Sequence, residues 1–267
     1  AERPEVERVI MPSTWRENGA GIFGTLGERV QYRAYVVNGF DGQDFTTGGL
    51  RGGRQRGSRA ISNDFAFVGR MDVDIIDGLL IGGSFYTGQT GQERDITSSI
   101  DDVERSLPDA HLHLYDIHAQ YKAMGLSLRA LWTQAFLDES GKLNRAIGRG
   151  FTEVATGVRG LTDTDSGIAN RMQGFYIEAG YDVLPLFFDT KASLEPYFRY
   201  ERYDTQKSVQ DAGVGYTRDR TKDIQLYVAG LQFKPIPQVV FKIDYRHFDP
   251  REGDPADQIQ GLVGYVF

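Results

Sequence analysis

Cysteine is absent from this sequence of 267 residues, and tryptophan occurs only twice. Without cysteine there can be no disulfide framework, no thiolate metal ligand and no cysteine nucleophile, which excludes several classes of small secreted domain and enzyme. Basic residues are also in the minority: 30 lysines and arginines stand against 37 aspartates and glutamates, for a net charge of -7. Because nonspecific nucleic-acid binding draws on a basic surface, we expect no nucleic-acid partner.

Long hydrophobic runs are missing as well. No stretch approaches the roughly 18 consecutive apolar residues of a membrane-spanning helix, and no secretory signal peptide is recognisable, which we interpret as a processed form. What the chain does contain is glycine, at 32 residues against a usual share of ~7%, together with 14 tyrosines and 16 phenylalanines.

Apolar residues recur at every second position in segment after segment. In residues 239–247, one face carries Phe241 and Ile243 while the other carries Lys242 and Asp244. A period of two sustained over ~10 residues predicts a β-strand. By this criterion the sequence predicts eleven strands, over residues 19–26, 29–38, 64–74, 79–88, 111–123, 126–137, 172–183, 191–203, 223–234, 238–248 and 257–267.

The connections between these strands alternate between short and long. The short ones fall near Leu26–Arg29, Ile75–Gly78, Ala123–Gly125, Leu184–Thr190 and Pro235–Gln238, and the long polar ones at 39–63, 89–110, 138–171, 204–222 and 249–256. Tight turns at one end and long loops at the other are typical of a transmembrane β-barrel. Strands of 9–11 residues also suit a tilted crossing of the hydrocarbon. The sequence therefore predicts one all-β domain over residues 1–267, an antiparallel up-and-down barrel in a membrane.

A large soluble barrel or sandwich is the alternative, because periodicity does not say which face of a strand is inside. Two observations favour the membrane. Charged residues of both signs occupy one face of nearly every strand, more than a closed soluble core could satisfy. Tyrosine and phenylalanine also cluster near strand ends, as in Tyr197–Tyr203 and at Tyr265 and Phe267, where an interfacial girdle is expected. We therefore predict an apolar face toward lipid and a polar face toward a lumen.

Several stretches resemble known outer-membrane proteins. The last ten residues alternate and end on Phe267, which resembles the terminal strand signal of bacterial outer-membrane barrels. Other segments are similar to the porin family typified by the phosphate-selective porins O and P. They are Glu2-Arg3-Pro4, Pro12-Ser13-Thr14-Trp15-Arg16-Glu17-Asn18-Gly19-Ala20-Gly21 with Phe23-Gly24, Tyr35-Val36-Val37-Asn38-Gly39, Tyr197-Phe198-Arg199-Tyr200-Glu201 and Phe241-Lys242-Ile243-Asp244-Tyr245-Arg246. The resemblance implies a channel in the Gram-negative outer membrane, commonly trimeric, and does not by itself imply phosphate.

The number of strands is open. In such porins, segments like residues 2–24 lie within the chain, preceded by further strands. If the carboxyl end is periplasmic, the first and eleventh strands run in the same direction, so an odd number of extra strands must close an even barrel. Residues 4–11 supply a twelfth strand in one interpretation. In the other, which we favour, upstream strands are missing from this sequence and the barrel has up to sixteen.

The polar face of each strand predicts the lining of the lumen. With that face inward, the wall carries seven residues of each sign: Arg33, Arg70, Lys122, Arg129, Arg199, Lys242 and Arg246, with Asp72, Asp116, Glu178, Asp182, Glu195, Glu201 and Asp244. Rings of one charge select ions electrostatically, so a balanced wall predicts weak selection.

Loop 39–63 is the candidate selectivity element. It carries Arg51, Arg54, Arg56 and Arg59, whose guanidiniums, if folded inward, would present paired donors to phosphate or carboxylate. The alternative is a solvated external loop that pairs with lipopolysaccharide or a neighbour. Loop 138–171 is long enough to expect a role, and residues 143–158 within it suit a short helix or plug.

Two sharper motifs point elsewhere. Residues 19–24 match G-x-G-x-x-G, but a nucleotide fingerprint needs a helix after it and a strand follows here. His111 and His113 share a strand face near Asp116 and His118, which suits a metal site or a protease-like constellation; we expect them to be girdle or loop-anchoring residues instead. The sequence therefore predicts no catalytic residues, no metal and no cofactor.

These observations predict a passive diffusion channel for small hydrophilic, anionic solutes. The alternative is a structural or partner-binding barrel, occluded by its long loops, that serves as a scaffold in an envelope complex; an outer-membrane enzyme comes third. The expected partners are outer-membrane lipid, lipopolysaccharide, small-molecule solutes, and either two further copies in a homotrimer or an envelope complex.

Overall fold

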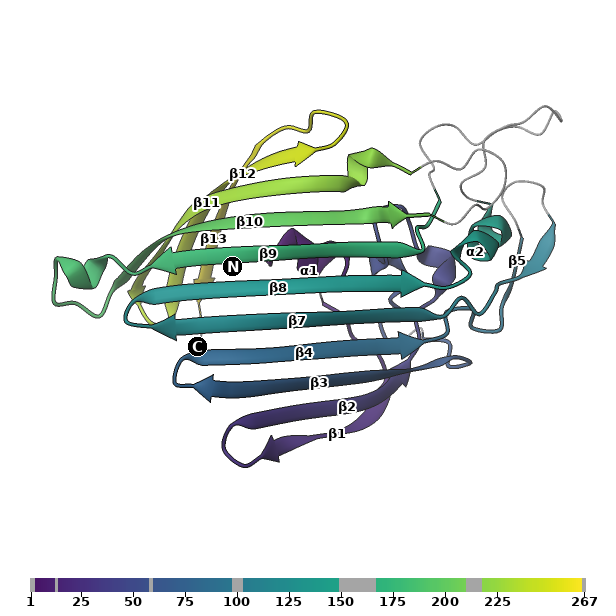
Figure 1. Cartoon of the computed structure of the whole chain (residues 1–267), viewed down its shortest axis with the longest axis horizontal. Coiled ribbons are helices and arrows are strands. Elements are labelled where there is room, and N and C mark those ends of the chain that lie inside the picture. Colours follow the sequence, from purple (N-terminus) through teal and green to yellow (C-terminus); the bar gives the residue numbers. More distant parts are fainter. Residues whose placement is uncertain are drawn as a thin grey trace.

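Eleven long strands form one antiparallel sheet in chain order (Figure 1). The computed structural model describes residues 3–12, 14–57, 60–97, 103–148, 167–209 and 218–265. The sheet strands are β1 (Gly19–Leu26), β2 (Val30–Asn38), β3 (Phe65–Ile76), β4 (Leu79–Gly88), β7 (Leu112–Ala123), β8 (Leu126–Leu137), β9 (Arg171–Tyr181), β10 (Ser193–Ser208), β11 (Asp223–Ile236), β12 (Val239–Pro250) and β13 (Gln258–Tyr265). This confirms the predicted fold class and all eleven predicted strands, with ends that differ by a few residues.

The remaining elements lie in the connections and at the amino-terminal side. They are α1 (Glu5–Val9), α2 (Ser140–Ile147), the short hairpin of β5 (Asp95–Thr97) and β6 (Glu104–Ser106), and single turns of 3-10 helix at Gly42–Asp44, Arg51–Gly53, Leu184–Leu186 and Arg220–Lys222. None of the helices in the described ranges is long and apolar enough to cross a membrane.

The sheet curls along its length, so that β12 and β13 turn back behind β9 and β10 (Figure 1). Short turns connect the strands at one end, on the left of Figure 1, and long connections gather at the other. Glycines at positive φ make two of the tight turns possible, Gly78 at 84° and Gly125 at 80°. We call these two ends the turn end and the loop end.

The apolar face of the sheet points outward. Ile177, Phe198 and Ile243 are 57%, 51% and 55% exposed, whereas Arg199 and Arg246 on the opposite face are 2% and 1% exposed. A sheet whose outer face met water would expose its charged side chains and bury its apolar ones. The predicted orientation, with the apolar side outward and the charged side on the concave face, is therefore confirmed.

Residues 4–11 are not a twelfth strand. They form α1, which begins after Pro4, and its apolar residues Val6 and Ile10 are both fully buried. Because Val6 and Ile10 are four residues apart, both lie on one side of the helix. This helical spacing, rather than the period of two expected for a strand, matches the structure of the segment. The two edges of the sheet, β1 and β13, run in the same direction, and no pairing joins them in the described part of the chain.

The loops fold inward and form an apolar core at the loop end. Phe40, Phe45 and Leu50 from the connection between β2 and β3 are 0–1% exposed and pack in one cluster with Leu143 of α2 and Ile10. Trp15 stacks on Phe40 with ring centroids 4.5 Å apart. Sequence reasoning described these connections as polar and left open whether loop 39–63 folds inward or stays external. In the structure this loop folds inward on its aromatic and leucine side chains, which pack together inside the sheet.

Candidate functional site: a charged cavity on the concave face

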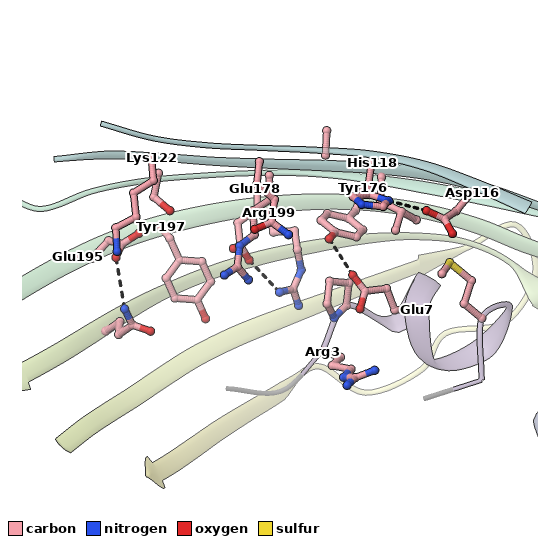
Figure 2. A pocket seen from close by; sticks show the side chains of 18 of the residues that line it. Arg3, Glu7, Asp116, His118, Lys122, Tyr176, Glu178, Glu195, Tyr197 and Arg199 are labelled. Atoms are coloured by element: carbon pink, nitrogen blue, oxygen red, sulfur yellow. Dashed lines mark hydrogen bonds and ion pairs between the residues drawn. The ribbon is translucent and has the colours of Figure 1, made fainter. Parts of the chain in front are cut away.

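A cavity of about 530 Å³ lies on the concave face, between the sheet and the segment that holds α1 (Figure 2). Seven cationic and four anionic side chains line it. They are Arg3, Arg70, Lys122, Arg129, Arg199, Lys234 and Lys242, with Glu7, Asp116, Glu178 and Glu195. The cavity therefore carries an excess of three positive charges when its histidine, His118, is neutral.

Strand register places the charges in rows across neighbouring strands. Arg129 of β8 lies beside Glu178 of β9, which lies beside Arg199 of β10. Arg199 donates to Glu178 at 2.9 Å and to Glu201 at 2.8 Å. Because Arg199 and Glu201 are almost completely buried, these pairs hold the wall together and leave the carboxylates little capacity to attract a solute.

A second network lies on β12. Arg246 donates to Asp244 at 2.8 Å, and the Tyr197 hydroxyl donates to the other oxygen of Asp244 at 2.9 Å. The ammonium of Lys242 lies 4.2 Å from the centroid of the Tyr197 ring. This aromatic face holds Lys242 at the cavity surface while leaving its N–H groups available.

His118 stands at the centre of a third network. Its Nδ1 lies 2.6 Å from Asp116 and its Nε2 lies 2.8 Å from Asp72, which also accepts from Arg70 at 2.7 Å. Ser84 donates to Asp116 rather than to the histidine. A serine hydrolase needs its hydroxyl on the imidazole, so this arrangement does not form an activated nucleophile.

The segment with α1 is bound to the wall by polar contacts (Figure 2). The Val6 amide donates to Glu201 at 3.0 Å, the Tyr176 hydroxyl donates to Glu7 at 2.8 Å, and Glu5 lies 3.4 Å from Arg246. A second cavity of about 250 Å³ lies on the β2–β4 side of the same segment. The segment thus divides the concave space into two lobes.

Several of the cavity cations are not neutralised by the protein. In the described ranges, Arg3, Lys122, Arg129 and Lys234 form no ion pair, whereas Arg70 and Arg199 are paired with carboxylates. Ammonium and guanidinium groups without a carboxylate partner are the donors that anionic solutes require.

Eight of the fourteen predicted lining residues reach the main cavity. These are Arg70, Asp116, Lys122, Arg129, Glu178, Glu195, Arg199 and Lys242. Arg33 lines the smaller cavity, and Asp72, Glu201, Asp244 and Arg246 lie on the concave face but are buried in the networks above. Asp182 departs from the prediction: it follows β9 in a turn and accepts from the amides of Leu184 and Leu194.

Of the loop arginines, the three that the structure describes, Arg51, Arg54 and Arg56, line neither of these two cavities. Arg54 donates to the carbonyl oxygens of Arg51 and Thr14 at 2.8 and 3.1 Å. Burial, followed by the charges of Arg51 and Arg56, lowers the pKa of Arg54. Arg59 lies outside the described residues.

The histidine pair lies at the loop end. The rings of His111 and His113 are 4.6 Å apart, and the Thr87 hydroxyl lies within 3.0 Å of both. Burial and the neighbouring His113 lower the pKa of His111. In the described part of the chain, no group of three or more metal-ligating side chains comes together.

Tyr197, Lys234, Tyr176 and Arg3 are among the lining residues that sequence reasoning missed. Tyr197 was grouped with girdle residues, although it stands two residues before Arg199 and so shares the inward face. Lys234 lies on β11, where apolar residues occupy both faces of the strand, and Tyr176 stands two residues before Glu178, which was predicted to face inward. Arg3 precedes the segment 4–11, whose structure the sequence left open, and only the contacts of that segment place it over the wall.

Comparison with known proteins supports the fold. No family in a scan of known protein families matches this sequence. An uncharacterised protein of Aquifex aeolicus is 29% identical over 269 residues, which cover all of this chain and 56% of that protein. OmpF of Salmonella typhi, solved in complex with daunomycin, is 17% identical with a TM-score of 0.51, over 88% of this chain and 56% of OmpF. A deletion mutant of OmpT from Vibrio cholerae is 10% identical, with a TM-score of 0.44, over 93% of this chain and 91% of that one.

The chain spans 56% of the length of both the Aquifex protein and OmpF. The likeness to OmpF concerns the fold alone, an antiparallel meander of strands. This chain therefore has the fold of an outer-membrane porin.

Proposed function

We propose that this protein is a passive diffusion channel of the outer membrane that prefers small hydrophilic anions. The observation that carries the proposal is the excess of cationic side chains around the main cavity, several of them without a carboxylate partner in the described residues. The proposal also draws on the resemblance of several stretches to the phosphate-selective porins O and P, a resemblance that does not by itself imply phosphate. The stretches that carry it include residues 197–201 and 241–246 on β10 and β12, which supply Arg199 and Lys242 to the cavity.

The preference is expected to be moderate. The wall as a whole is nearly balanced, because Arg199 and Arg246 are paired with carboxylates. Selection then rests on groups such as Lys122, Arg129 and Lys234, which replace part of a solute's hydration and still allow its release. Nothing in this mechanism requires bond chemistry, so we assign no catalytic residue.

A closed pore requires a closed wall. In a bilayer every backbone amide and carbonyl must be paired, so the free edges of β1 and β13 must pair with further strands. Because β1 and β13 run in the same direction, antiparallel closure requires an odd number of them. A second copy of these eleven strands in the same orientation would meet the edges in parallel and does not satisfy this requirement. We propose that the closed barrels associate as a homotrimer.

The arginine loop remains a proposed contributor. Arg51 and Arg56 are exposed at the loop end, above the cavity rather than in it. At that position they would attract anions to the entrance over a range set by screening, on the order of 8 Å at physiological ionic strength.

Conductance and reversal potential in a planar bilayer test the function. We expect stepwise currents and, under a salt gradient, a reversal potential on the anion-preferring side. The combined change Lys122→Gln and Arg129→Gln should move that potential toward cation preference. Lys191→Gln removes the same kind of charge from an exposed turn-end residue outside the cavity and should leave it unchanged.

The arginine loop is tested in the same measurement. Replacing Arg51, Arg54, Arg56 and Arg59 with alanine should reduce the anion preference at low salt more than at high salt, because screening weakens attraction at a distance. An unchanged reversal potential at both salt concentrations would remove the loop from the mechanism.

A second function is favoured by the apolar core at the loop end. Phe40, Phe45 and Leu50 are buried together with residues of α1 and α2 inside the curl of the sheet, which is the position of a plug. A barrel occluded in this way would act as a scaffold in an envelope complex. Folded protein that inserts into the bilayer without stepwise current would favour the scaffold over the channel.

A further inference from the structure

Three arginines surround two carboxylates on the outward face, near the loop end. Asp204 of β10 lies directly opposite Asp223 of β11 in the register, and both side chains are 5% exposed. Arg218 contacts both carboxylates, at 3.1 Å in the case of Asp223. Arg202 and Arg251 reach Asp223 at 3.5 and 3.1 Å. We call these five residues the rim arginine cluster.

The cluster lies just beyond a row of aromatic rings. Arg202 follows Tyr200 by two residues on β10 and so shares its outward face. The Tyr200 ring lies 5.9 Å from Phe175 and 5.2 Å from Tyr227, in neighbouring strands. Rows of outward aromatic side chains mark the boundary between hydrocarbon and headgroups. The cluster is on the loop-end side of this row, at the height of the lipid headgroups.

The arginines do more than neutralise the aspartates. Two carboxylates opposite each other across strands repel, which accounts for two of the three guanidiniums and leaves one positive charge. Arg202 and Arg251 are 41% and 56% exposed, and their contacts with Asp223 use Nη2 of one and Nε of the other. A guanidinium has five N–H donors, so both side chains keep donors that face outward.

Among the neighbouring charges, two ion pairs cancel and one carboxylate does not. Arg220 lies 3.8 Å from Glu252 and Lys222 lies 3.8 Å from Asp219, so these four cancel in pairs. Asp249 is exposed and lies near Gln225, at 3.4 Å. Its negative charge offsets the single positive charge left on the cluster and weakens the attraction of an anion, so Asp249 serves as a test position.

We propose that the rim arginine cluster binds the phosphate groups of an outer-leaflet glycolipid, the lipid A portion of lipopolysaccharide. Arginine binds phosphate with two parallel N–H donors, and exposed basic groups at the headgroup level attract anionic lipids. The acyl chains of the same lipid would lie over the aromatic row and over Phe198 below it. This inference rests on the proposed membrane position of the outward face, not on conduction through the lumen.

The test is the retention of lipid A by protein in phosphatidylcholine nanodiscs, measured by native mass spectrometry. Wild-type protein should retain lipid A that carries both phosphates and release dephosphorylated lipid A. The double variant Arg202→Gln, Arg251→Gln should bind lipid A about tenfold more weakly, the factor that corresponds to 1.4 kcal/mol. Asp249→Asn should strengthen retention, and Lys191→Gln, at the turn end, should have no effect.

Each outcome decides the question. Equal retention by wild type and the double variant, equal retention of dephosphorylated lipid A, or displacement of lipid A by inorganic phosphate at equal concentration would overturn the proposal. If the double variant does not fold, Asp249→Asn still tests it, because a purely structural cluster predicts no gain. If the outward face does not lie in the membrane, the protein will not enter the nanodisc. If the protein is not a channel, it will carry no current but will still bind lipid A.

Discussion

Ile177→Arg tests the direction of the outward face. Ile177 is 57% exposed on β9, between the outward aromatic residues Phe175 and Tyr181 of the same strand. An arginine on the lipid face costs about 2–4 kcal/mol at the bilayer midplane and about 0–1 kcal/mol near the interfaces. Ile177 lies opposite Tyr200 of the aromatic row in the register, nearer to an interface than to the midplane, so we expect the free energy of unfolding to fall by about 1–2 kcal/mol.

The control is the same substitution on the inward face. Gln31 of β2 is exposed and lies beside Asp72, whose side chain belongs to the concave face. Gln31→Arg adds a charge to a wet surface, where substitutions usually change stability by less than about 0.5 kcal/mol. A third variant, Phe175→Arg, places the charge in the aromatic row and should cost less than Ile177→Arg.

Urea unfolding of the protein in phospholipid vesicles provides the measurement. The expected order of stability loss is Ile177→Arg, then Phe175→Arg, then Gln31→Arg. If Ile177→Arg and Gln31→Arg unfold at the same urea concentration, the outward face is bathed in water. The reasoning that leads from periodicity to lipid would then be refuted, and the porin function with it.

Three further predictions concern the wall. Glu201→Gln should lower the free energy of unfolding by about 2–4 kcal/mol, because it breaks a buried charge pair and a hydrogen bond to the α1 segment; Tyr176→Phe removes one hydrogen bond and should cost about 1 kcal/mol in the same urea titration. Gly82→Ala should lower the free energy of unfolding by about 1–3 kcal/mol, since the added Cβ would lie 2.2 Å from a carboxylate oxygen of Asp72 and 2.8 Å from the carbonyl oxygen of Met71. Gly261→Ala should leave stability unchanged, because nothing lies within 4 Å of its added Cβ. Equal effects of the two substitutions would contradict the packing around Gly82. The lowered pKa of His111 means that the folded state takes up a proton there less readily than the unfolded state, so stability is lost as pH falls through about 6.5. In urea titrations above and below that pH, His111→Gln should lose less stability than the wild type. An identical loss in both proteins would refute the assignment to His111.

The strands could be predicted from the sequence because their signal is local. Alternation of residues such as Phe241, Lys242, Ile243 and Asp244 fixes the side-chain direction along each strand, and short turns fix which strands are neighbours. The same parity places Arg129 and Arg199 on the inward face. Lys234 shows the limit of this reasoning. It lies on β11, where both faces of the strand carry apolar residues, so alternation does not indicate which face points inward.

Where the chain leaves the sheet, local patterns were insufficient. The segment at Glu5–Val9 is too short for a helix to be stable alone, and it owes its position to contacts with Glu201, Tyr176 and Arg246. Those partners are more than 160 residues away in the sequence. The connection with Phe40 and Leu50 looked polar by composition, but a few apolar side chains decide where it packs.

The amino-acid sequence by itself determined the strands, their order and which side of the sheet is apolar, because each depends on the spacing between near neighbours along the chain. Only the tertiary structure decided which charges remain free. Arg129 and Arg199 both lie beside Glu178 in the register, and within the described residues only Arg199 forms an ion pair with it. Which arginine reaches that carboxylate depends on the packing of side chains across three strands, and no single segment contains this information.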